Sequence, residues 1–457
     1  MVERFKARVV AQGYSQRAGI DYEETFSPVV RFESVRSVIA LATQERMQIH
    51  QMDVKTAFLN GELDEEVFMR QPEGAVEEGR ENFVCRLQKS IYGLKQSPRC
   101  WNTALDDHLK KMNFVQTKGD PCLYISKDPT EPAIIAVYVD DILIAARSDE
   151  KIAEVKCAIA DQFEAKDMGE LHYFLGVKIV RDRCTDSIWL GQPSYTENIL
   201  QQFNMQDAKL QRTPLNPSLK LTKADENSIL VNTELYQSAV GKLLYLSTRT
   251  RPDIAFAVST VAKFTAKPTE QHWKAVKHIL RYLVGTVDYG LQFTKDGVTE
   301  CVGYTDADWA GDVDDRKSTS GYLFKIGGAT VSWMSRKQSC IALLTVEAEY
   351  ISLTHAAQEA IWLNRLLAEL KELKEPTKPA LIHEDNQSAI SMSRNPQFHG
   401  RSKHIAIKYH FIRDETNNGT IEVHYCKSQD MIADMMTKGL YAERFEKLRD
   451  MTGVKKC

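Results

Sequence analysis

The sequence predicts an α+β protein in which sheets and amphipathic helices build two or three domains. The run AIIAVYVDDILIAA at residues 133–146 is rich in Val and Ile and indicates two strands that meet at a hairpin turn. Residues 149–163 then place apolar side chains at helical spacing. From residue 301 onward, alternating strand patterns are mixed with a long helical pattern. A chain of 457 residues has room for two or three such domains.

Composition is that of a globular protein, with 43% apolar and 26% charged residues. No apolar run reaches membrane-spanning length, and the charged start MVERFKARVV is unlike a signal peptide. Nine cysteines without a C-x-x-C pair indicate neither a zinc knuckle nor a disulfide framework, and favour reduced intracellular thiols. The net charge is −3, and basic residues gather locally at 263–281 and 394–413, a pattern that is usually a solvated face.

The middle of the chain predicts one more hairpin and three helices. LHYFLGVKIV and SIWLGQ, separated by the polar RDRCTD, predict the hairpin over residues 171–192. A short helix is expected over residues 194–205, and two prolines in the polar segment 211–228 mark a boundary. Residues 251–264 and 272–286 predict two amphipathic helices separated by Pro268.

The last third of the chain begins with a strand, CVGYTDADW. GYLFKIGGATVSWMS then predicts a hairpin around Gly327 and Gly328, since glycine tolerates the positive φ of a two-residue turn. Residues 345–370 predict a long helix, ALIHED a strand, NQSAISMS a helix and IEVHYCK a final strand, followed by a last helix. The order strand, hairpin, helix, strand, helix, strand and helix suits an α/β domain with a mixed sheet.

Two adjacent aspartates, Asp140 and Asp141, interrupt the apolar run at residues 133–146. Buried carboxylates are unfavourable unless they are paired, hydrogen-bonded or bound to a cation, so this pair favours a divalent metal site at the hairpin tip. An Asp-Asp turn between buried strands is an equally good interpretation of these residues alone. Asp53, which follows the apolar-leaning ERMQIHQM, adds a third carboxylate at a predicted strand end.

Ordered sequence motifs along almost the whole chain resemble the reverse transcriptase and ribonuclease H portion of copia-type retrotransposon Pol polyproteins. The resemblance implies a right-hand polymerase fold, with fingers and palm at residues 1–192, thumb and connection at 193–295, and a ribonuclease H-like domain at 296–457. The motifs are KARVVAQGYSQ, GIDYEETFSPVVR, HQMDVKTAFLNGELDEEVFMRQPEG, VCRLQKSIYGLKQSPRCWN, VYVDDILIA, MGELHYFLGV, TRPDIAFAVS, HILRYLVGT, YTDADWAGD, RKSTSGYLF, VEAEYISL, EDNQSAI, KHIAIKYHFIR and IADMMTKGL.

The resemblance implies that Asp53, Asp140 and Asp141 hold two Mg²⁺ or Mn²⁺ ions for DNA synthesis. The partners it implies are an RNA template, a DNA primer, an RNA–DNA hybrid and deoxynucleoside triphosphates, inside the cell in a cytoplasmic particle or the nucleus. For Leu175 and Gly176, at the expected primer grip, a core leucine and a turn glycine are equally good interpretations. For Phe58, the expected 2′-hydroxyl gate, the alternative is a core residue. The implied substrate-binding residues are Lys6, Arg8, Phe58, Tyr92, Gly93, Lys95, Tyr138, Leu175 and Gly176.

The resemblance also implies a nuclease site of four carboxylates around two metal ions: Asp306, Glu349, Asp385 and Asp434. Each aspartate alone is equally typical of a strand end or helix cap. Glu347 and Glu349 are two residues apart on one helix and cannot both face the same site, and we choose Glu349. We likewise choose Asp306 over Asp308 in the first strand. His424 lies within a predicted strand, and we interpret it as structural.

Three features depart from the family pattern. The chain begins almost on the fingers motif, so we expect a fragment that lacks the preceding strand. Glu384 stands where the family usually has Cys, and Ala406 where it usually has Asp. The competing hypothesis is therefore a catalytically silent remnant that binds nucleic acid or serves a host role. The sequence leaves the oligomeric state open.

Overall fold

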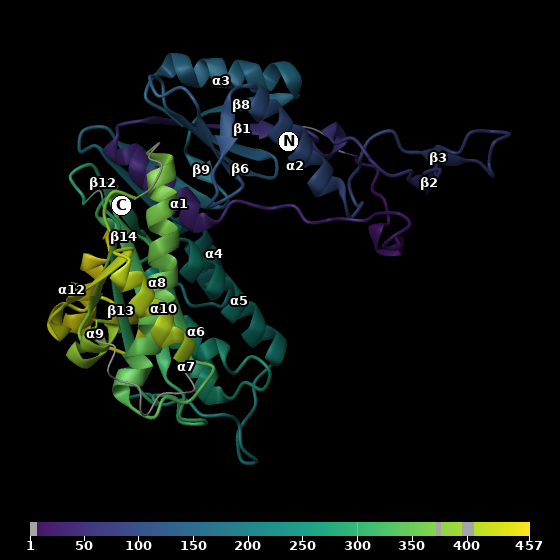
Figure 1. Cartoon of the computed structure of the whole chain (residues 1–457). Helices are drawn as coiled ribbons and strands as arrows, with labels where there is room; N and C mark the ends of the chain where they lie inside the picture. The colour runs from purple at the N-terminus through teal and green to yellow at the C-terminus, as the bar shows by residue number, and fades with distance from the viewer. Residues whose placement is uncertain (1–6, 299, 372–375, 395–405) are drawn as a thin grey trace. The chain divides into compact units, whose positions relative to one another are not determined.

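The computed structural model describes the chain except residues 1–6, 299, 372–375 and 395–405. It divides into two compact units (Figure 1). Unit 1 comprises Met1–Arg31 and Met47–Leu171, and unit 2 comprises Phe32–Arg46 and His172–Cys457. Each unit has its own sheets and apolar core, and the α+β class expected from the sequence is confirmed. Among the described helices, none combines the length and apolar character that crossing a bilayer requires.

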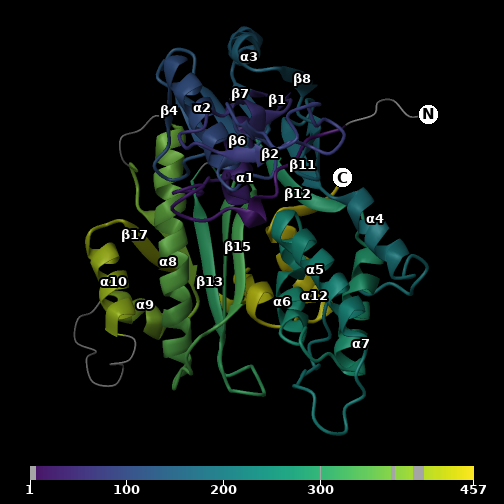
Figure 2. The same ribbon diagram turned by 90° about the vertical axis from the view of Figure 1, so that its right-hand side faces the viewer.

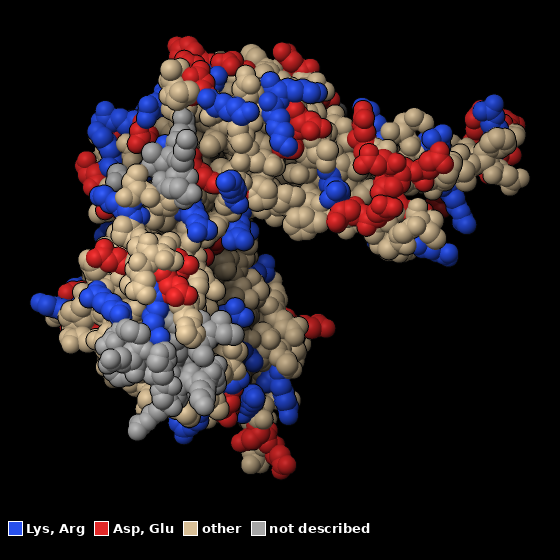
Figure 3. All heavy atoms as spheres, in the orientation of Figure 1, with Lys and Arg blue, Asp and Glu red and all other residues tan. Residues whose placement is uncertain are grey.

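Unit 1 is built on a six-stranded antiparallel sheet in the order β4-β5-β6-β7-β1-β8. Helices α2 and α3 pack on the same face of this sheet, around one apolar core. A separate ribbon, β2–β3, extends away from the sheet (Figure 1), and acidic side chains gather on this part of the unit (Figure 3). The elements are 3₁₀ helices η1 (Gly13–Ser15) and η2 (Ala57–Asn60), strands β1 (Gln48–Val54), β2 (Phe68–Arg70), β3 (Val84–Arg86), β4 (Phe114–Gln116), β5 (Leu123–Ser126), β6 (Ala133–Tyr138), β7 (Asp141–Ala146) and β8 (Ala165–Glu170), and helices α2 (Ser97–Lys111) and α3 (Asp149–Gln162).

The predicted strand pair and the helix after it are both present in unit 1. Strands β6 and β7 form the hairpin of the apolar run, with a two-residue turn between Tyr138 and Asp141. Helix α3 follows at once because Ser148 caps it, its hydroxyl accepting a hydrogen bond from the Lys151 amide at 3.1 Å. Sequence and structure therefore agree on the elements that carry the two adjacent aspartates.

The first sheet of unit 2 joins distant parts of the chain. Its antiparallel order is β18-β12-β11-β10-β9, so the predicted hairpin β10–β11 pairs with β12, and β12 pairs with the last strand of the chain. Strands from all three predicted domains meet in this sheet, and the predicted boundaries after residues 192 and 295 remain predictions. The strands are β9 (Tyr173–Phe174), β10 (Val177–Asp182), β11 (Ser187–Gly191), β12 (Tyr289–Thr294) and β18 (Val454–Lys456).

The second sheet of unit 2 has the mixed order β15-β14-β13-β16-β17, in which β13, β16 and β17 are parallel and β14 and β15 antiparallel. Figure 2 shows the long helix α8 on one side of this sheet and α5 to α7 on the other. The glycine turn is confirmed, with φ of 60° at Gly327 and 85° at Gly328. The strands are β13 (Val302–Asp308), β14 (Thr319–Ile326), β15 (Ala329–Lys337), β16 (Ala380–Glu384) and β17 (Ile421–Tyr425).

The predicted helices over residues 194–205, 251–264, 272–286 and 345–370 are present in unit 2 as α4, α6, α7 and α8, and the helix expected in NQSAISMS is α9. Helices α1, α5 and α10 were not predicted, and one predicted helix differs in form. The expected last helix from Asp434 is a four-residue turn, α11, and a separate helix, α12, follows it before the final strand. The helices are α1 (Phe32–Gln44), α4 (Pro193–Gln202), α5 (Thr233–Arg249), η3 (Pro252–Ile254), α6 (Ala255–Ala262), α7 (Glu270–Val284), α8 (Thr345–Leu370), α9 (Gln387–Arg394), α10 (Ala406–Asn417), η5 (Ser428–Asp430), α11 (Asp434–Thr437) and α12 (Ala442–Met451).

Helix α1 belongs to unit 2 although it lies early in the sequence. Its Arg36 is fully buried, and the guanidinium donates to the carbonyl oxygens of Val331 on β15, at 2.6 Å, and Thr248 on α5, at 2.9 Å. The guanidinium also lies 4.0 Å from the centre of the Trp333 ring, a cation–π contact. Helix α1 is therefore fixed by a strand that follows it by 295 residues.

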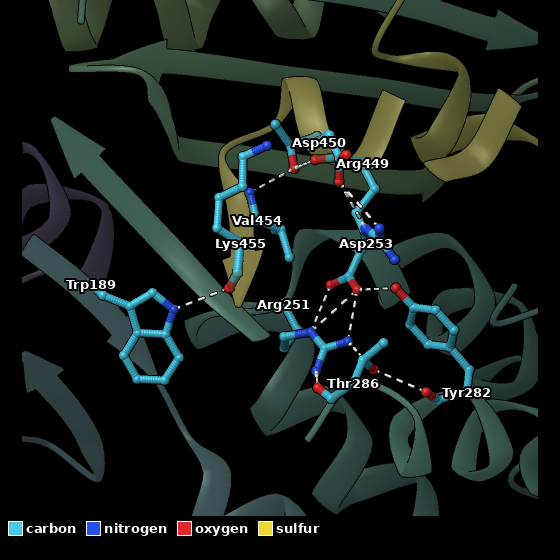
Figure 4. Close-up of polar contacts among 10 residues, drawn as sticks. Trp189, Arg251, Asp253, Tyr282, Thr286, Arg449, Asp450, Val454 and Lys455 are labelled. Atoms are coloured by element: carbon cyan, nitrogen blue, oxygen red, sulfur yellow. Dashed lines mark hydrogen bonds and ion pairs between the residues drawn. The ribbon is translucent and has the colours of Figure 1, made fainter. Parts of the chain in front are cut away.

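A buried ion pair links the helices of unit 2 to the end of the chain (Figure 4). Arg251 donates to Asp253 at 2.9 and 2.8 Å, and both side chains are almost completely buried. The Tyr282 hydroxyl on α7 donates to the same carboxylate at 2.6 Å, and Arg449 on α12 adds a positive charge. Burial alone would raise the pKa of Asp253, but the Arg251 charge and these hydrogen bonds lower it.

Candidate active sites

The first acidic cluster lies at one end of the six-stranded sheet of unit 1. Asp141 begins β7 and pairs directly with Asp53 on the neighbouring strand β1. Asp140 occupies the turn before β7, and its carbonyl accepts a hydrogen bond from the Val54 amide at 2.8 Å. The structure thus brings together the three aspartates that the sequence predicts as polymerase ligands.

The turn that carries Asp140 has a strained backbone held by a buried tryptophan. Val139 has a φ of 56°, in the left-handed region that β-branched residues rarely adopt. Its carbonyl accepts a hydrogen bond of 2.6 Å from the indole Nε1 of Trp101, a side chain of α2 that is only 2% exposed. Trp101 therefore fixes the carbonyl of a conformation that the turn alone would not favour.

The carboxylates of this cluster are crowded and half-buried. Burial and the Asp53 charge raise the pKa of Asp140, while Arg8 opposes the shift. Burial, Asp140 and Asp53 also raise the pKa of Asp141, although the Gln51 side chain donates to it at 2.8 Å. Oxygen ligands with uncompensated negative charge suit a hard divalent cation such as Mg²⁺.

Three predicted substrate-binding residues lie against one another in the same unit. The Arg8 guanidinium lies 5.2 Å from the centre of the Tyr92 ring, and the Phe58 ring meets Tyr92 edge-on at 5.1 Å. Gly93 has a φ of 95°, and a Cβ there would lie 2.1 Å from the Ala11 carbonyl oxygen. Gly93 therefore allows the close approach of two chain segments.

The remaining predicted residues of unit 1 have separate positions. Tyr138 ends β6 opposite Asp141 and is partly exposed. Lys95 donates from its ammonium to the Gln16 carbonyl at 3.2 Å, so it holds the neighbouring chain segment. Lys6 lies outside the described residues.

Leu175 and Gly176 form the tight turn between β9 and β10 in unit 2. Both have positive φ, 48° and 76°. The Tyr245 hydroxyl donates to the Leu175 carbonyl at 2.8 Å, and a Cβ on Gly176 would lie 2.5 Å from that hydroxyl oxygen. The geometry accounts for a glycine at this position, and the primer-grip role remains a prediction.

The second acidic cluster lies at one edge of the mixed sheet in unit 2. Asp306 lies near the carboxyl end of β13, Asp385 directly follows the parallel neighbour β16, and Glu349 comes from the first turns of α8. One carboxylate oxygen from each of the three lies within 4.8 Å of the other two. Among the described residues, this is the one group of acidic, histidine or cysteine side chains with that spacing.

Within the described part of the chain, two buried oxygens at or beside this cluster have no hydrogen-bond partner. They are Oε2 of Glu349, which is 8% exposed, and Oε2 of Glu384, which is fully buried. Burial, followed by the charges of Glu384, Asp306 and Asp385, raises the pKa of Glu349. Since buried carboxylates are normally paired or bind metal, the residues fit a divalent cation.

The fourth predicted ligand, Asp434, lies on the other side of Asp306. The Lys438 ammonium bridges the two aspartates, 2.9 Å from Asp434 Oδ1 and 3.3 Å from Asp306 Oδ2. Arg444 makes a second ion pair with Asp434, and the Thr437 hydroxyl donates to Asp306. Burial and Asp306 nevertheless raise the pKa of Asp434 to about 6.

The structure separates the alternatives that the sequence leaves open at this site. Glu347 accepts a hydrogen bond from the Leu343 amide at 2.6 Å and lies outside the three-carboxylate group, whereas Glu349 belongs to it. Asp308 lines an adjacent pocket. His424 lies in β17 and pairs with Glu422 at 2.7 Å, in agreement with a structural interpretation.

Comparison with known proteins decides the family. Residues 1–217 match the family model for reverse transcriptase (RNA-dependent DNA polymerase). The retrovirus-related Pol polyprotein from transposon TNT 1-94 of Nicotiana tabacum is 43% identical over 459 residues, 99% of this chain and 34% of that protein. A putative transposon Ty5-1 protein of Saccharomyces cerevisiae is 35% identical over 309 residues, 67% of this chain and 100% of the relative. The chain belongs to the copia-type retrotransposon Pol family.

This copia-type Pol chain spans about a third of the length of the first Pol polyproteins that it matches, 34% for the tobacco transposon. Among solved structures, a foamy viral protease–reverse transcriptase in complex with double-stranded DNA is similar, with 13% identity and a TM-score of 0.46. The match covers 85% of this chain and 70% of that one.

Sequence reasoning missed the cations of the second cluster in this Pol chain. Lys438 lies four residues after Asp434, a spacing at which opposite charges on a helix often pair, and that spacing was a usable signal. Arg444 comes from the next helix, and Glu384 contributes an unpartnered oxygen beside Asp385. Neither position follows from local sequence, because each depends on tertiary packing.

Proposed function

We propose that the chain is an RNA-directed DNA polymerase and a ribonuclease H, with one carboxylate site in each unit. The observation that carries this proposal is the direct pairing of Asp53 with Asp141 beside the Asp140 turn, at the end of an antiparallel sheet. The group of Asp306, Glu349 and Asp385 supports the second activity.

At the polymerase site, Asp53, Asp140 and Asp141 would hold two Mg²⁺ or Mn²⁺ ions, and Asp306, Glu349, Asp385 and Asp434 would hold two at the nuclease site. Ions bound there would activate the attacking oxygen and stabilise the leaving group. At the polymerase site these are the primer 3′-hydroxyl and pyrophosphate, and at the nuclease site they are water and the ribose 3′-oxygen.

The chain's own side chains then select and orient the substrates. Arg8, whose charge acts on Asp140, would pair with the triphosphate, and Lys6 would assist it. Phe58, packed on Tyr92, would exclude a ribose 2′-hydroxyl. Gly93 and Lys95 shape the neighbouring backbone, and Tyr138, Leu175 and Gly176 would contact the primer end.

The proposed partners are an RNA template, a DNA primer, the RNA–DNA hybrid and deoxynucleoside triphosphates. We place the activity inside the cell, in a cytoplasmic particle or the nucleus. All nine cysteines are among the described residues and are free thiols, in keeping with a reducing compartment. We retain fingers and palm at 1–192, thumb and connection at 193–295 and a ribonuclease H-like domain at 296–457 as the functional division.

The polymerase proposal is tested by primer extension on an RNA template with Mg²⁺. Asp140→Asn should abolish extension but leave hybrid binding nearly unchanged, because the variant loses a metal ligand and no phosphate contact. Asp128→Asn, which neutralises an exposed carboxylate before β6, is the matched control and should extend normally. A wild-type chain that binds the hybrid but does not extend the primer would refute the polymerase proposal and favour a silent remnant.

The nuclease proposal is tested by cleavage of an RNA–DNA hybrid. Asp385→Asn should stop cleavage while primer extension continues. Asp414→Asn, which changes an exposed carboxylate on α10, should cleave at the wild-type rate. Wild-type cleavage by Asp385→Asn would show that this cluster is not the nuclease site.

A further inference from the structure

Negative charge is distributed unevenly across the second acidic cluster. On the side of Glu349 and Glu384, two buried carboxylates each have an oxygen without a hydrogen-bond partner. Asp385 is close to both, and it accepts a hydrogen bond from the Ser428 hydroxyl at 2.6 Å. Within the described part of the chain, no ion pair engages these three carboxylates, and a divalent cation would relieve the repulsion among them.

On the side of Asp434, the chain itself supplies the positive charge. The aspartates Asp306 and Asp434 are each 2% exposed, and the Lys438 ammonium lies between them. Arg444 engages the second oxygen of Asp434, and Thr437 donates to Asp306. A cation shared by these two aspartates would have to occupy the place of the ammonium.

We propose that Lys438 is a built-in cation of the nuclease site that makes its two metal positions unequal. The first divalent ion binds among Asp306, Glu349 and Asp385, and the second binds only by displacing the Lys438 ammonium from Asp306 and Asp434. The proposal rests on the nuclease function proposed above. It adds a positioning residue that sets the metal concentration at which the site becomes complete.

An adjacent pocket provides a destination for the displaced ammonium. Its volume is about 120 Å³, and Lys438 lines it together with Asp308, Asp312 and Lys263. Asp312 is already paired with Lys263 at 3.1 Å. Asp308 lies two residues beyond Asp306 in β13, so its carboxylate is the available acceptor on that side.

The test is a Mn²⁺ titration of the full chain by isothermal calorimetry, with Asp53→Asn and Asp141→Asn present in every sample to remove the polymerase site. The parent, which carries only Asp53→Asn and Asp141→Asn, should bind one Mn²⁺ ion strongly and a second ion with an affinity about tenfold or more lower. Lys438→Met should tighten the second ion by about tenfold or more, because the competing charge is gone. Lys438→Gln should do the same with a polar side chain.

Two charge-matched variants complete the design. Lys438→Arg keeps the cation and should retain the weak second ion. Lys456→Met removes an exposed ion pair to Asp288 elsewhere in the same unit and should bind metal as the parent does. Thermal melting without metal gives a second readout: Lys438→Met should melt below Lys438→Arg, since Asp306 and Asp434 lose their counter-charge.

An unchanged second-ion affinity in both Lys438→Met and Lys438→Gln would overturn the proposal, and so would equal affinities for the two ions in the parent. If the chain with an intact polymerase site cleaves the hybrid while either result is found, the Lys438 proposal fails and the nuclease function stands. If the parent binds no Mn²⁺ and the intact chain cleaves no hybrid, both fail together.

Discussion

Replacing Arg251 with methionine should strongly destabilise unit 2, because it leaves a carboxylate buried without its partner. Arg251 and Asp253 have side-chain exposures of 1% and 0%, and they share three hydrogen bonds (Figure 4). The guanidinium also donates to the carbonyl and hydroxyl oxygens of Thr286, both at 2.7 Å. After the substitution, Asp253 still accepts the hydrogen bond from the Tyr282 hydroxyl, but it loses its described ion-pair partner.

The magnitude follows from this geometry. Removal of one partner from a buried ion pair lowers the free energy of unfolding by about 3–5 kcal/mol. The double variant Arg251→Met with Asp253→Leu removes both charges, the carboxylate acceptor of the Tyr282 hydroxyl and the guanidinium donors to Thr286, which costs about 1–3 kcal/mol. The double variant should therefore be more stable than Arg251→Met alone.

The assay is urea denaturation of the full chain, with amide hydrogen exchange followed in peptides from α7 and α12 to isolate unit 2. The pKa of Asp253 is lowered in the folded state, so its contribution is present above the pKa of the unfolded chain and is lost as pH falls through the lower folded value. A loss below about 1.5 kcal/mol for Arg251→Met, or a double variant less stable than the single one, would refute the reasoning.

Three further predictions concern other sites. Phe58→Ala should raise ribonucleotide incorporation by about tenfold or more relative to deoxyribonucleotide in primer extension; unchanged selectivity with lower stability would indicate a core residue. Trp101→Phe removes the hydrogen bond to Val139 and should slow primer extension by about tenfold, while the free energy of unfolding falls by about 1 kcal/mol. A loss of activation free energy no larger than the loss of unfolding free energy would contradict a positioning role. Burial would raise the pKa of Asp312, but Lys337 and Lys263 lower it to about 2. The stabilisation from these ion pairs is therefore complete above about pH 4 and disappears as pH falls toward 2. Asp312→Asn should remove this acid-sensitive part of the free energy of unfolding, about 1–2 kcal/mol after solvent screening, in unfolding measured between about pH 2 and 7.

The sequence predicted well where one local pattern determines one element. The apolar run around Asp140 predicts the hairpin because its residues pair with one another, and the spacing in residues 345–370 predicts both ends of α8. Most of the acidic ligands also stand at or near the end of a predicted strand or in a predicted helix, while Asp140 lies in a turn and Asp434 in a four-residue helical turn. Their convergence depends on strand order, which came from the resemblance and not from periodicity.

Contacts between distant segments were beyond sequence reasoning. Nothing near TRPDI indicates that Arg251 and Asp253 would bury their charges together, because Thr286 and Tyr282, which satisfy them, lie about one helix further along. Strand β18 has only three residues, too few for a strand pattern in the sequence, and it forms because it pairs with β12. The Lys438 bridge likewise requires Asp306 and Asp434 to be neighbours first.

The position of α1 has a consequence for how the chain is made. Its apolar face and Arg36 are buried against β15, and the carbonyl of Val331 follows Arg36 by 295 residues. At a synthesis rate of about 5–20 residues per second, the helix waits about 15–60 s on the ribosome before that strand exists. During this time β15 is absent, so Val35, Val38 and Ile39, all fully buried in the finished fold, lie on a helix whose packing is not yet complete. All strands of the six-stranded sheet of unit 1 are synthesised before β15, so nascent chains would pass through a stage in which this sheet is complete while α1 is still open to chaperones.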